Sequence, residues 1–473
     1  MKILLVEPGT EFDINVPSGL LKIAAVLREH KIDVVLKNYS GLKITKEKII
    51  KDLEKIDFDI IGIKVLTSPI IGRAILISKA AKELKKTVVW GGPHPTVMPN
   101  QTLENKFIDS IVIGEGEKSF LDLIKYYRNG GITPLGCAIK KNKKIIVLPP
   151  QKECVDINKL PLTAWDLIED INRYFPNKKH NTVSITTSRG CMYNCGFCHN
   201  SNKNVNNYQG NFRLLDTNKM IEEFNFVNSL TKNEIDRVYF NSDLHLAYPE
   251  YIKKFSKDLI KSKLNIKWNS SSRFHILNEE LINIIDKAGC EEVLFGTESG
   301  SKRIQKLVNK PINKEHAIKI SKILRKKGIY ITNAYIFGHP TETFNELKQT
   351  IKLISEIPAD QNLVQLYRPL PGTPYFELCK KVVNGFDKII PKKLEDWNTF
   401  GVAGYDINVS KIPSRKLYYN FYRWNLIYQL SHHINLQKFH LRNKRYEDFF
   451  KTFYNNKFTF KAKEMLTAKK YIK

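Results

Sequence analysis

Apolar residues recur along the first 130 residues with two alternating periods, which predicts a regular succession of strands and helices. Short runs rich in Ile, Leu and Val, such as 2–6, 60–65 and 87–90, predict buried strands. Helical spacing of apolar residues over 19–29 and 72–84 predicts helices between them. Strands that alternate with helices indicate a parallel, doubly wound sheet, in which ligands bind outside the carboxyl ends of the strands.

The same alternation resumes after a proline-punctuated stretch. Six further strands are predicted over 183–187, 237–241, 266–269, 292–296, 330–337 and 362–367, with helices between them. Six such units predict an incomplete (β/α)6 barrel, whose site lies at the carboxyl ends of its strands. We therefore expect an α/β protein with a first domain over 1–130, a linker over 131–180, a barrel domain over 181–375 and a mainly helical C-terminal region over 376–473.

Composition and charge change this picture little. The 473 residues are 42% hydrophobic and 26% charged, as in ordinary globular proteins. The net charge of +28 is attributed mainly to a Lys-rich solvated surface, and no nucleic-acid-binding motif accompanies it. The basic segment 431–473 has 11 Lys or Arg against 3 Asp or Glu, and it indicates a cap over the barrel, a membrane-surface element or an anionic-partner arm.

The sequence does not have the apolar pattern expected of a targeting or membrane-spanning segment. The first residues read as a strand and not as a signal peptide, and the most apolar long stretch, 59–78, is broken by Lys64, Pro69 and Arg73. We therefore expect no transmembrane segment and a cytoplasmic, reducing location.

The most specific chemistry lies in three closely spaced cysteines. Cys191, Cys195 and Cys198 have the spacing CxxxCxxC, which suits three irons of a 4Fe–4S cluster and leaves the fourth iron open for a substrate or cofactor. The alternative of a zinc site needs a fourth ligand, for which His199 is adjacent. A disulfide between two of these three cysteines would leave the third thiol unpaired.

This motif, with its approach Thr186-Thr187-Ser188-Arg189-Gly190, resembles the signature of the radical S-adenosylmethionine (SAM) superfamily. The resemblance implies that the open iron binds SAM and that the cluster's electron cleaves it to a 5′-deoxyadenosyl radical. Carboxylates at strand ends suit the ammonium or ribose of SAM, and a cation or hydroxyl suits its carboxylate. The predicted SAM contacts are Phe197, Asp243, Ser272, Arg273, Glu298, Ile336 and Gly338.

The loops of the first domain resemble those of the cobalamin-binding domain that precedes one large class of radical SAM domains. The resemblance rests on the runs Trp90-Gly91-Gly92-Pro93-His94-Pro95-Thr96 and Ile113-Gly114-Glu115-Gly116-Glu117. It implies cobalamin contacts at Pro8, Thr67, Ser68, Gly91, Gly92, His94, Gly114, Glu115 and Gly116. The DxHxxG loop that supplies a cobalt ligand in many cobalamin domains is absent from residues 1–130, so His94 is interpreted as a loop residue near the cofactor and not as a ligand.

The combined resemblance implies a cobalamin-dependent radical SAM enzyme, with methylation of an unactivated carbon as the favoured reaction. A 4Fe–4S cluster, SAM and cobalamin are the implied cofactors, and flavodoxin or ferredoxin is the type of electron donor expected. A cyclase or oxidative enzyme of the anaerobic magnesium-protoporphyrin ester cyclase type remains an alternative, as does a non-catalytic cobalamin sensor. A methylthiotransferase fits less well, because that family has extra cysteines in its first domain. The sequence identifies neither the substrate nor a general base.

Overall fold

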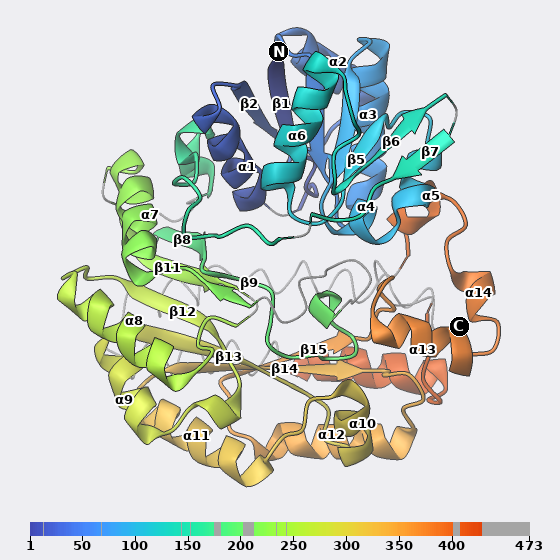
Figure 1. Cartoon of the computed structure of the whole chain (residues 1–473). Coiled ribbons are helices and arrows are strands. Elements are labelled where there is room, and N and C mark those ends of the chain that lie inside the picture. The colour runs from blue at the N-terminus through green and yellow to red at the C-terminus, as the bar shows by residue number, and fades with distance from the viewer. Residues whose placement is uncertain are drawn as a thin grey trace. The chain divides into compact units, whose positions relative to one another are not determined.

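The computed structural model describes residues 1–12, 14–67, 69–142, 144–151, 153–174, 181–201, 212–232, 234–242, 244–400 and 407–427. The chain forms two compact units, and each is built from separate stretches of sequence. The first unit combines most of Met1–Arg237 with residues 369–380 and 385–400, and the second combines residues 238–368 with 381–384 and 407–427 (Figure 1). The basic segment 431–473 lies outside the described residues.

A seven-stranded sheet forms the centre of the first unit, with the strand order β2-β1-β3-β4-β5-β6-β7. Strands β1 to β5 are parallel, as predicted. The order β2-β1-β3-β4-β5 places a topological switch between β1 and β3, where ligands of such sheets bind at the carboxyl ends. The strands are β1 (Lys2–Glu7), β2 (Asp33–Asn38), β3 (Ile60–Lys64), β4 (Thr87–Gly91), β5 (Ser110–Val112), β6 (Cys137–Lys141) and β7 (Lys144–Val147).

Helices cover both faces of this sheet. On one face, α1 and α6 pack together, and Gly62 of β3 lets the Phe120 ring of α6 approach the sheet. On the other face, α2 and α3 pack together, and the Trp90 indole N–H donates to the Ser78 hydroxyl of α3 at 2.9 Å. The helices are α1 (Ser18–Glu29), α2 (Lys46–Glu54), α3 (Ile70–Glu83), α4 (Pro93–Val97), α5 (Pro99–Glu104) and α6 (Gly116–Asn129).

The stretch 131–180, expected as a linker, contributes two strands to the sheet. β6 pairs antiparallel with β5, and β7 pairs antiparallel with β6. Residues Cys137, Ala138 and Ile139 are buried in this arrangement. Pro149 and Pro150 follow β7, so the prolines mark the end of a strand and do not prevent one from forming.

Late residues of the chain complete the first unit. After α13 (Pro374–Val382) and α14 (Phe386–Ile389), the short helix η5 (Leu394–Asn398) packs against α3. The buried Trp397 donates its indole N–H to Gln101 Oε1 at 2.6 Å, and Asn398 Oδ1 accepts the Gly72 backbone N–H at 3.0 Å. The unit also includes β8 (Asn181–Thr186), β9 (Ser188–Arg189), β10 (Arg213–Leu214), α7 (Thr217–Leu230), η1 (Trp165–Leu167), η2 (Ile171–Tyr174) and η3 (His199–Ser201).

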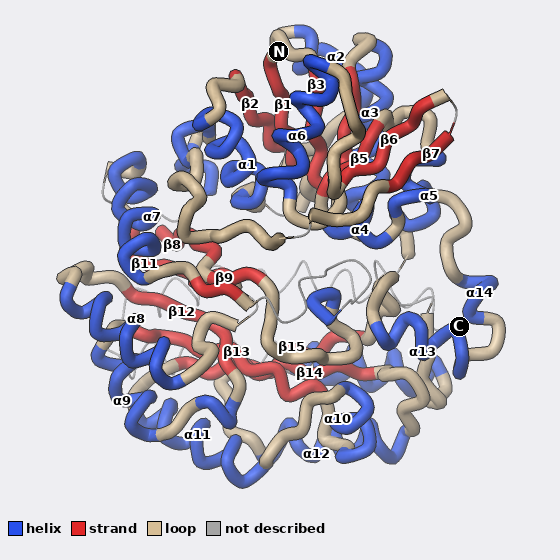
Figure 2. The backbone as a smooth tube through the Cα atoms, in the orientation of Figure 1, coloured by secondary structure: helices blue, strands red, loops and turns tan. Residues whose placement is uncertain are grey.

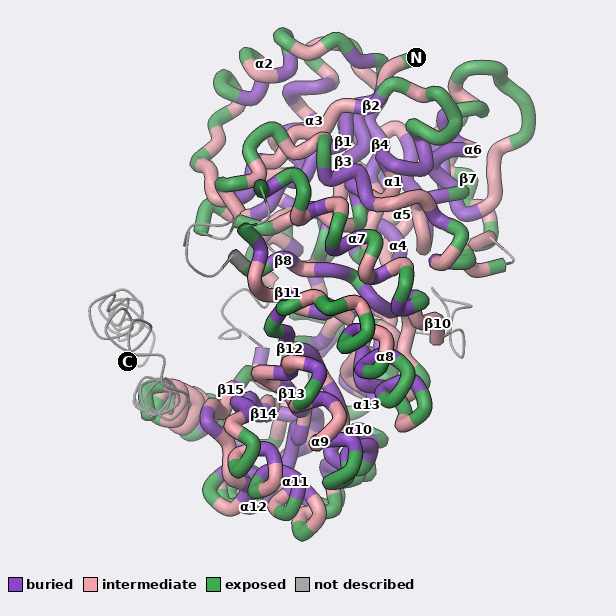
Figure 3. The backbone as a smooth tube through the Cα atoms, turned by 90° about the vertical axis from the view of Figure 1, so that its left-hand side faces the viewer, coloured by how far each residue is buried: buried purple, intermediate pink, exposed green. Residues whose placement is uncertain are grey.

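The six strands predicted for the barrel are all present. Their sheet has the order β15-β14-β13-β12-β11-β8, and β12 to β15 are parallel to one another. In the second unit, the helices line the outer side of the strands (Figure 2), and the central strands are buried (Figure 3). The remaining elements are β11 (Ile235–Asn241), α8 (Pro249–Lys261), β12 (Lys267–Ser272), η4 (Phe274–Ile276), α9 (Glu279–Lys287), β13 (Cys290–Glu298), α10 (Lys302–Val308), α11 (Lys314–Lys326), β14 (Tyr330–Phe337), α12 (Phe344–Glu356), β15 (Gln361–Leu366) and a helix over 414–427.

The predicted α/β class and the succession of strands and helices are thereby confirmed. Within the described residues, no helix has the length and apolar character needed to cross a bilayer.

Candidate functional site

The cysteine loop, residues 190–198, follows β9 in the first unit. Gly190 turns the chain with φ of 71°, and the Cys198 backbone N–H donates to the Cys195 carbonyl at 3.0 Å. The Gly196 carbonyl accepts the backbone N–H of Tyr375 at 2.9 Å. Cys195 is buried, whereas Cys191 and Cys198 are partly exposed. The loop is therefore fixed by contacts within itself and with a segment nearly 180 residues later in the chain.

The donor set of this loop fits an iron–sulfur cluster. All seven cysteines are described, and none forms a disulfide. Three thiols on one short loop each bind a different iron of a 4Fe–4S cluster, so they need not converge on one point. Among the described residues, no three Cys, His, Asp or Glu side chains converge on a single metal ion. His199, the alternative fourth ligand of a zinc site, begins the short helix η3.

A cavity of about 350 Å³ lies in the same unit, at the carboxyl edge of the seven-stranded sheet. Its wall is mostly apolar and comes from β1, β3, β4, α1, α6 and the stretch before α7. The volume is near the lower end of the ~300–1,000 Å³ typical of small-molecule sites, so the cavity suits part of a cofactor as large as cobalamin. The apolar lining includes Leu5, Leu20, Ile23, Ile63, Val89 and Phe120.

Five of the nine residues predicted to contact cobalamin line this cavity: Gly91, Gly92, Gly114, Glu115 and Gly116. Gly92 has φ of 99°, and a Cβ there would lie 3.0 Å from the Val65 carbonyl oxygen, so a side chain would strain the loop. Pro8, Thr67 and His94 are not among the lining residues, and Ser68 lies outside the described residues.

His94 belongs to the short helix α4 and not to a loop, so this part of the prediction is corrected. The residue follows Pro93, which begins the helix directly after the turn at Gly92. Its ring is fully buried, lies 3.1 Å from the Thr67 hydroxyl through Nδ1, and packs edge-on against Trp397 with ring centroids 5.6 Å apart. Burial lowers the pKa of His94 to about 4, so the imidazole is neutral at physiological pH.

Four charged side chains form a cluster at the rim of the cavity, which we call the rim cluster: Glu115, Glu117, Arg189 and Arg213. Arg213 binds Glu115 in a bidentate manner, with Nη2–Oε1 and Nη1–Oε2 distances of 2.6 and 3.0 Å. Arg189 binds Glu117 through Nη2 and lies 3.3 Å from Glu115 Oε1 through Nη1. Glu115, Glu117 and Arg189 also line the cavity.

The rim cluster holds Glu115 and Arg189 in their charged forms. Burial by itself raises the pKa of Glu115, but Arg213 and Arg189 outweigh that effect and hold the pKa below its usual value. Burial likewise lowers the pKa of Arg189, and Glu117 and Glu115 outweigh it, so that the net shift is upward. The cluster consists of two acidic and two basic side chains, so its formal charges cancel.

A second ion pair lies on the cavity wall. Lys22 Nζ is 2.5 Å from Glu223 Oε1, and the same carboxylate accepts the backbone N–H and the hydroxyl of Thr163, each at 3.1 Å. Burial lowers the pKa of Lys22, and Glu223 opposes this shift. Because these three residues come from α1, the stretch before η1, and α7, the pair ties three separate parts of the first unit together at the cavity.

The predicted SAM contacts fall in both units. Phe197 is partly buried in the cysteine loop of the first unit, and Asp243 lies outside the described residues. In the second unit, the buried Ser272 donates its hydroxyl to the Leu246 carbonyl at 3.2 Å, and Arg273 precedes η4. Ile336 is partly buried in β14, and Gly338 follows that strand with φ of 82°. Their contact with SAM stays a prediction.

Glu298 ends β13 and forms a buried ion pair with Lys310, with an Oε1–Nζ distance of 2.7 Å. Its backbone has φ of 66°, a left-handed conformation that is uncommon for a side chain of this size, and the β13–β14 register shifts at this point. Lys310 could not be assigned from the sequence, because its partner lies 12 residues away and only the fold brings the two together.

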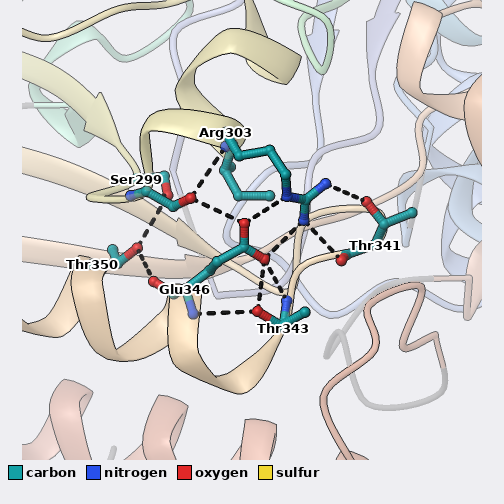
Figure 4. A network of polar contacts seen from close by, with 8 residues as sticks. Ser299, Arg303, Thr341, Thr343, Glu346 and Thr350 are labelled. Atoms are coloured by element: carbon teal, nitrogen blue, oxygen red, sulfur yellow. Dashed lines mark hydrogen bonds and ion pairs between the residues drawn. The ribbon is translucent and has the colours of Figure 1, made fainter.

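A polar network braces the loop after β13 against the loop after β14 (Figure 4). Arg303 binds both carboxylate oxygens of Glu346, with Nε–Oε1 and Nη2–Oε2 distances of 2.6 and 2.8 Å. Glu346 also accepts the Ser301 hydroxyl and caps α12 together with Thr343. The loops that carry Glu298 and Gly338 are thus held together by side chains that the sequence analysis did not single out.

Comparison with known proteins gives a consistent result. The profile of the B12 binding domain matches residues 12–124, and that of the radical SAM superfamily matches residues 185–354. The chain is 32% identical over 391 residues to the uncharacterized methyltransferase PH0819 of Pyrococcus horikoshii. The alignment covers 80% of this chain and 83% of that protein. It is 24% identical to the anaerobic magnesium-protoporphyrin IX monomethyl ester cyclase of Rubrivivax gelatinosus, over 82% of this chain and 71% of the cyclase.

Solved structures show the same fold. The radical SAM methyltransferase TsrM of Kitasatospora setae, solved with cobalamin and a 4Fe–4S cluster, aligns with a TM-score of 0.69 and 16% identity, over 87% of this chain and 83% of that chain. The two matched profiles imply a 4Fe–4S cluster, SAM and cobalamin as cofactors, in agreement with the cysteine loop and the cavity. The chain therefore belongs to the family of radical SAM enzymes that carry an N-terminal cobalamin-binding domain.

Proposed function

We propose that this enzyme transfers a methyl group to an unactivated carbon of its substrate. The observation that carries the proposal is the position of Arg189, which lines the cavity and stands two residues before Cys191. The cysteine loop and the apolar cavity of the cobalamin-binding domain thus belong to one compact unit. The relative from Pyrococcus horikoshii, which carries the name of a methyltransferase, supports the same reaction class.

The residues of the chain bind and orient the cofactors. Cys191, Cys195 and Cys198 hold the cluster and leave one iron open for SAM. When bound, the cluster supplies the electron that cleaves SAM, and cobalamin carries the methyl group. The apolar wall of the cavity excludes water from the part of cobalamin that it encloses, and Gly91 and Gly92 allow the cofactor to approach the backbone.

The second unit is proposed to orient SAM. Glu298 accepts a hydrogen bond from the SAM ammonium or ribose, while Ser272 and Arg273 face its carboxylate. Ile336 packs on the adenine, next to the turn at Gly338. The Lys310 ammonium holds Glu298 in place, and the network around Glu346 keeps the loops of Glu298 and Gly338 at a fixed separation.

We also propose that the electron comes from an external donor of the flavodoxin or ferredoxin type and that the enzyme works in the reducing cytoplasm. Seven free cysteines support a reducing environment.

Anaerobic reconstitution with iron, sulfide, cobalamin and SAM tests the proposal. Ultraviolet–visible spectra report the binding of cluster and cobalamin, and mass spectrometry reports 5′-deoxyadenosine and S-adenosylhomocysteine. Formation of both products supports methyl transfer. Protein that loads the cluster but binds no cobalamin, or that forms no S-adenosylhomocysteine, contradicts it.

Two cysteine variants provide a matched comparison. Cys198 and Cys154 are both partly exposed, so Cys198→Ala and Cys154→Ala differ in position and not in burial. We expect Cys198→Ala to lose the cluster absorbance and SAM cleavage, and Cys154→Ala to keep both.

A cyclase is the second candidate, because the relative from Rubrivivax gelatinosus matches over 82% of this chain. SAM labelled in its methyl group separates the two reactions. Only methyl transfer places the label in the product, whereas a cyclase forms 5′-deoxyadenosine and leaves the substrate without label.

A further inference from the structure

Arg189 connects two loops that the proposed function assigns to different cofactors. It is the last residue of β9, directly before the cysteine loop at Gly190. Its guanidinium contacts Glu115 and Glu117, which lie around the start of α6 and line the cavity. One side chain therefore spans from the start of the cluster-binding loop to the rim of the cobalamin cavity.

The pairing of β9 with β10 explains why the rim cluster needs four members. Arg189 and Arg213 face each other across these antiparallel strands, which brings two guanidinium groups close together. Glu115 contacts both, and Glu117 balances the second positive charge. Arg213 also donates to the Val155 carbonyl at 2.6 Å, and Glu115 Oε2 accepts the Val155 backbone N–H at 3.2 Å. The four side chains thus form a largely buried group whose formal charges cancel.

A buried ion network of this kind contributes more to geometry than to stability. The desolvation of two charges offsets most of their attraction, so an apolar replacement often gives equal stability. What a bidentate guanidinium provides is a fixed distance and direction between the groups that it joins. The groups joined here are the loop 114–117 and the first turn of the cysteine loop.

We propose that Arg189 is a positioning residue that fixes the beginning of the cysteine loop, and with it the cluster, relative to cobalamin in the cavity. This inference rests on the proposed function, because it presupposes that both cofactors bind. The Tyr375 backbone N–H at Gly196 holds the loop near its other end, and Arg189 attaches its beginning. We call the contacts of the two Arg189 Nη atoms with Glu115 and Glu117 the Arg189 fork. Without this fork, the three cysteines still hold a cluster, but the cluster no longer has one defined position.

Three variants distinguish the effect of the Arg189 contacts on loop position from the effect of the Arg189 charge. Arg189→Gln removes the fork and leaves an excess negative charge. Arg189→Lys keeps the charge but binds one carboxylate at a time. The double variant Glu117→Gln with Arg189→Gln restores the charge balance without restoring the fork. Arg28→Gln is the control, because Arg28 forms an ion pair with Asp166 at 2.6 Å in the same unit while both side chains are 41% exposed.

Hydrogen–deuterium exchange on the full chain gives the first measurement. In Arg189→Gln, we expect peptides covering 114–117 and 189–198 to exchange roughly tenfold faster, because loss of one partner leaves a buried charge uncompensated. Both peptides change together, since one side chain joins them. Arg28→Gln leaves both at the wild-type rate. Unchanged exchange of 189–198 in a folded Arg189→Gln protein overturns the proposal.

Electron paramagnetic resonance of protein loaded with the reduced cluster and cob(II)alamin gives the second measurement. We expect wild-type iron content in every variant, a broadened spectrum with more than one environment in Arg189→Gln, and a partial return to the wild-type spectrum in Arg189→Lys. The spectrum of the double variant stays broadened. A wild-type spectrum in the double variant shows that charge balance and not position matters, and it overturns the proposal.

The failure of this inference is distinguishable from failure of the proposed function. Wild-type protein that binds no cobalamin contradicts the proposed function itself. Wild-type protein that loads both cofactors, together with an Arg189→Gln spectrum identical to it, contradicts only the role of Arg189. If Arg189→Gln does not fold, Glu117→Gln and Arg189→Lys provide the same two measurements.

Discussion

Replacement of Glu342 by glutamine is expected to change how the stability of the second unit depends on pH. Glu342 follows β14 in the loop that begins at Gly338, and its side chain is fully buried. Its Oε2 accepts the backbone N–H groups of Gly338 and His339 at 2.7 and 3.2 Å, while its Oε1 has no hydrogen-bond partner among the described residues. Burial raises the pKa of Glu342 to about 8, although the two amides oppose the shift.

The sign of the effect follows from this raised pKa. The ordinary pKa of the carboxyl is 4.5, so between pH 4.5 and 8 the folded protein holds a proton that the unfolded chain releases. The stabilising contribution is complete below pH 4.5 and is lost as the pH rises through 8. With ~1.4 kcal/mol for each pKa unit, the loss is about 3 kcal/mol at pH 7 and about 5 kcal/mol above pH 8. Glutamine keeps an acceptor for the two amides and cannot ionise.

Thermal unfolding between pH 6 and pH 9, followed by exchange of peptides from β14 and α12, measures the difference. Glu342→Gln should lose much less stability than wild type across this range and should exceed wild type at pH 9. Glu280→Gln is the control, because Glu280 is 60% exposed in its ion pair with Lys253. Identical pH profiles for wild type and Glu342→Gln would refute the reasoning.

Three further predictions concern other parts of the two units. Glu346→Ala should destabilise the second unit by about 3 kcal/mol in thermal unfolding, because it removes a helix cap and several buried hydrogen bonds, and Glu346→Gln should cost less. Gly72→Ala should destabilise the first unit by about 1–3 kcal/mol, because the new Cβ would lie 2.7 Å from Asn398 Oδ1; an unchanged melting temperature would contradict the docking of η5. Gly62→Val should weaken cobalamin binding measured by absorbance, because a Cβ there would lie 3.0 Å from the Phe120 ring and a larger side chain pushes that ring into the cavity; cobalamin binding equal to that of wild type would contradict this reasoning.

Elements with strong local periodicity were predictable from the sequence. The strand expected over 330–337 coincides with β14, and the helix expected over 19–29 differs from α1 by one residue. Buried parallel strands read as continuous apolar runs, and their helices keep an apolar stripe, so the pattern alone locates both. The hairpin of β6 and β7 was not predicted, because the prolines that follow it are typical of a linker. Its pairing with β5 depends on contacts between segments distant in sequence, which a local pattern does not contain.

The candidate site was predictable where a motif is continuous in sequence. The cysteines and the glycine loops are of this kind, and five of the glycine-loop residues line the cavity. Arg189, Arg213, Lys22 and Lys310 were not assigned a partner, because each pairs with a carboxylate that only the fold brings near. The alternation of glycine and glutamate over 114–117, together with an arginine before the cysteine loop, was the available signal for the rim cluster.

The return of the late segment to the first unit has a consequence for how the enzyme is made. The cysteine loop ends at residue 198, but the contact from Tyr375 to Gly196 exists only after Tyr375 has been synthesised. At about 5–20 residues per second, the roughly 180 intervening residues take roughly 9–35 s. During this interval, the nascent thiols lack part of the packing that fixes them in the finished protein. Insertion of the cluster is therefore expected to follow synthesis of this late segment, and a ribosome-released fragment that ends before Tyr375 is expected to load cluster poorly.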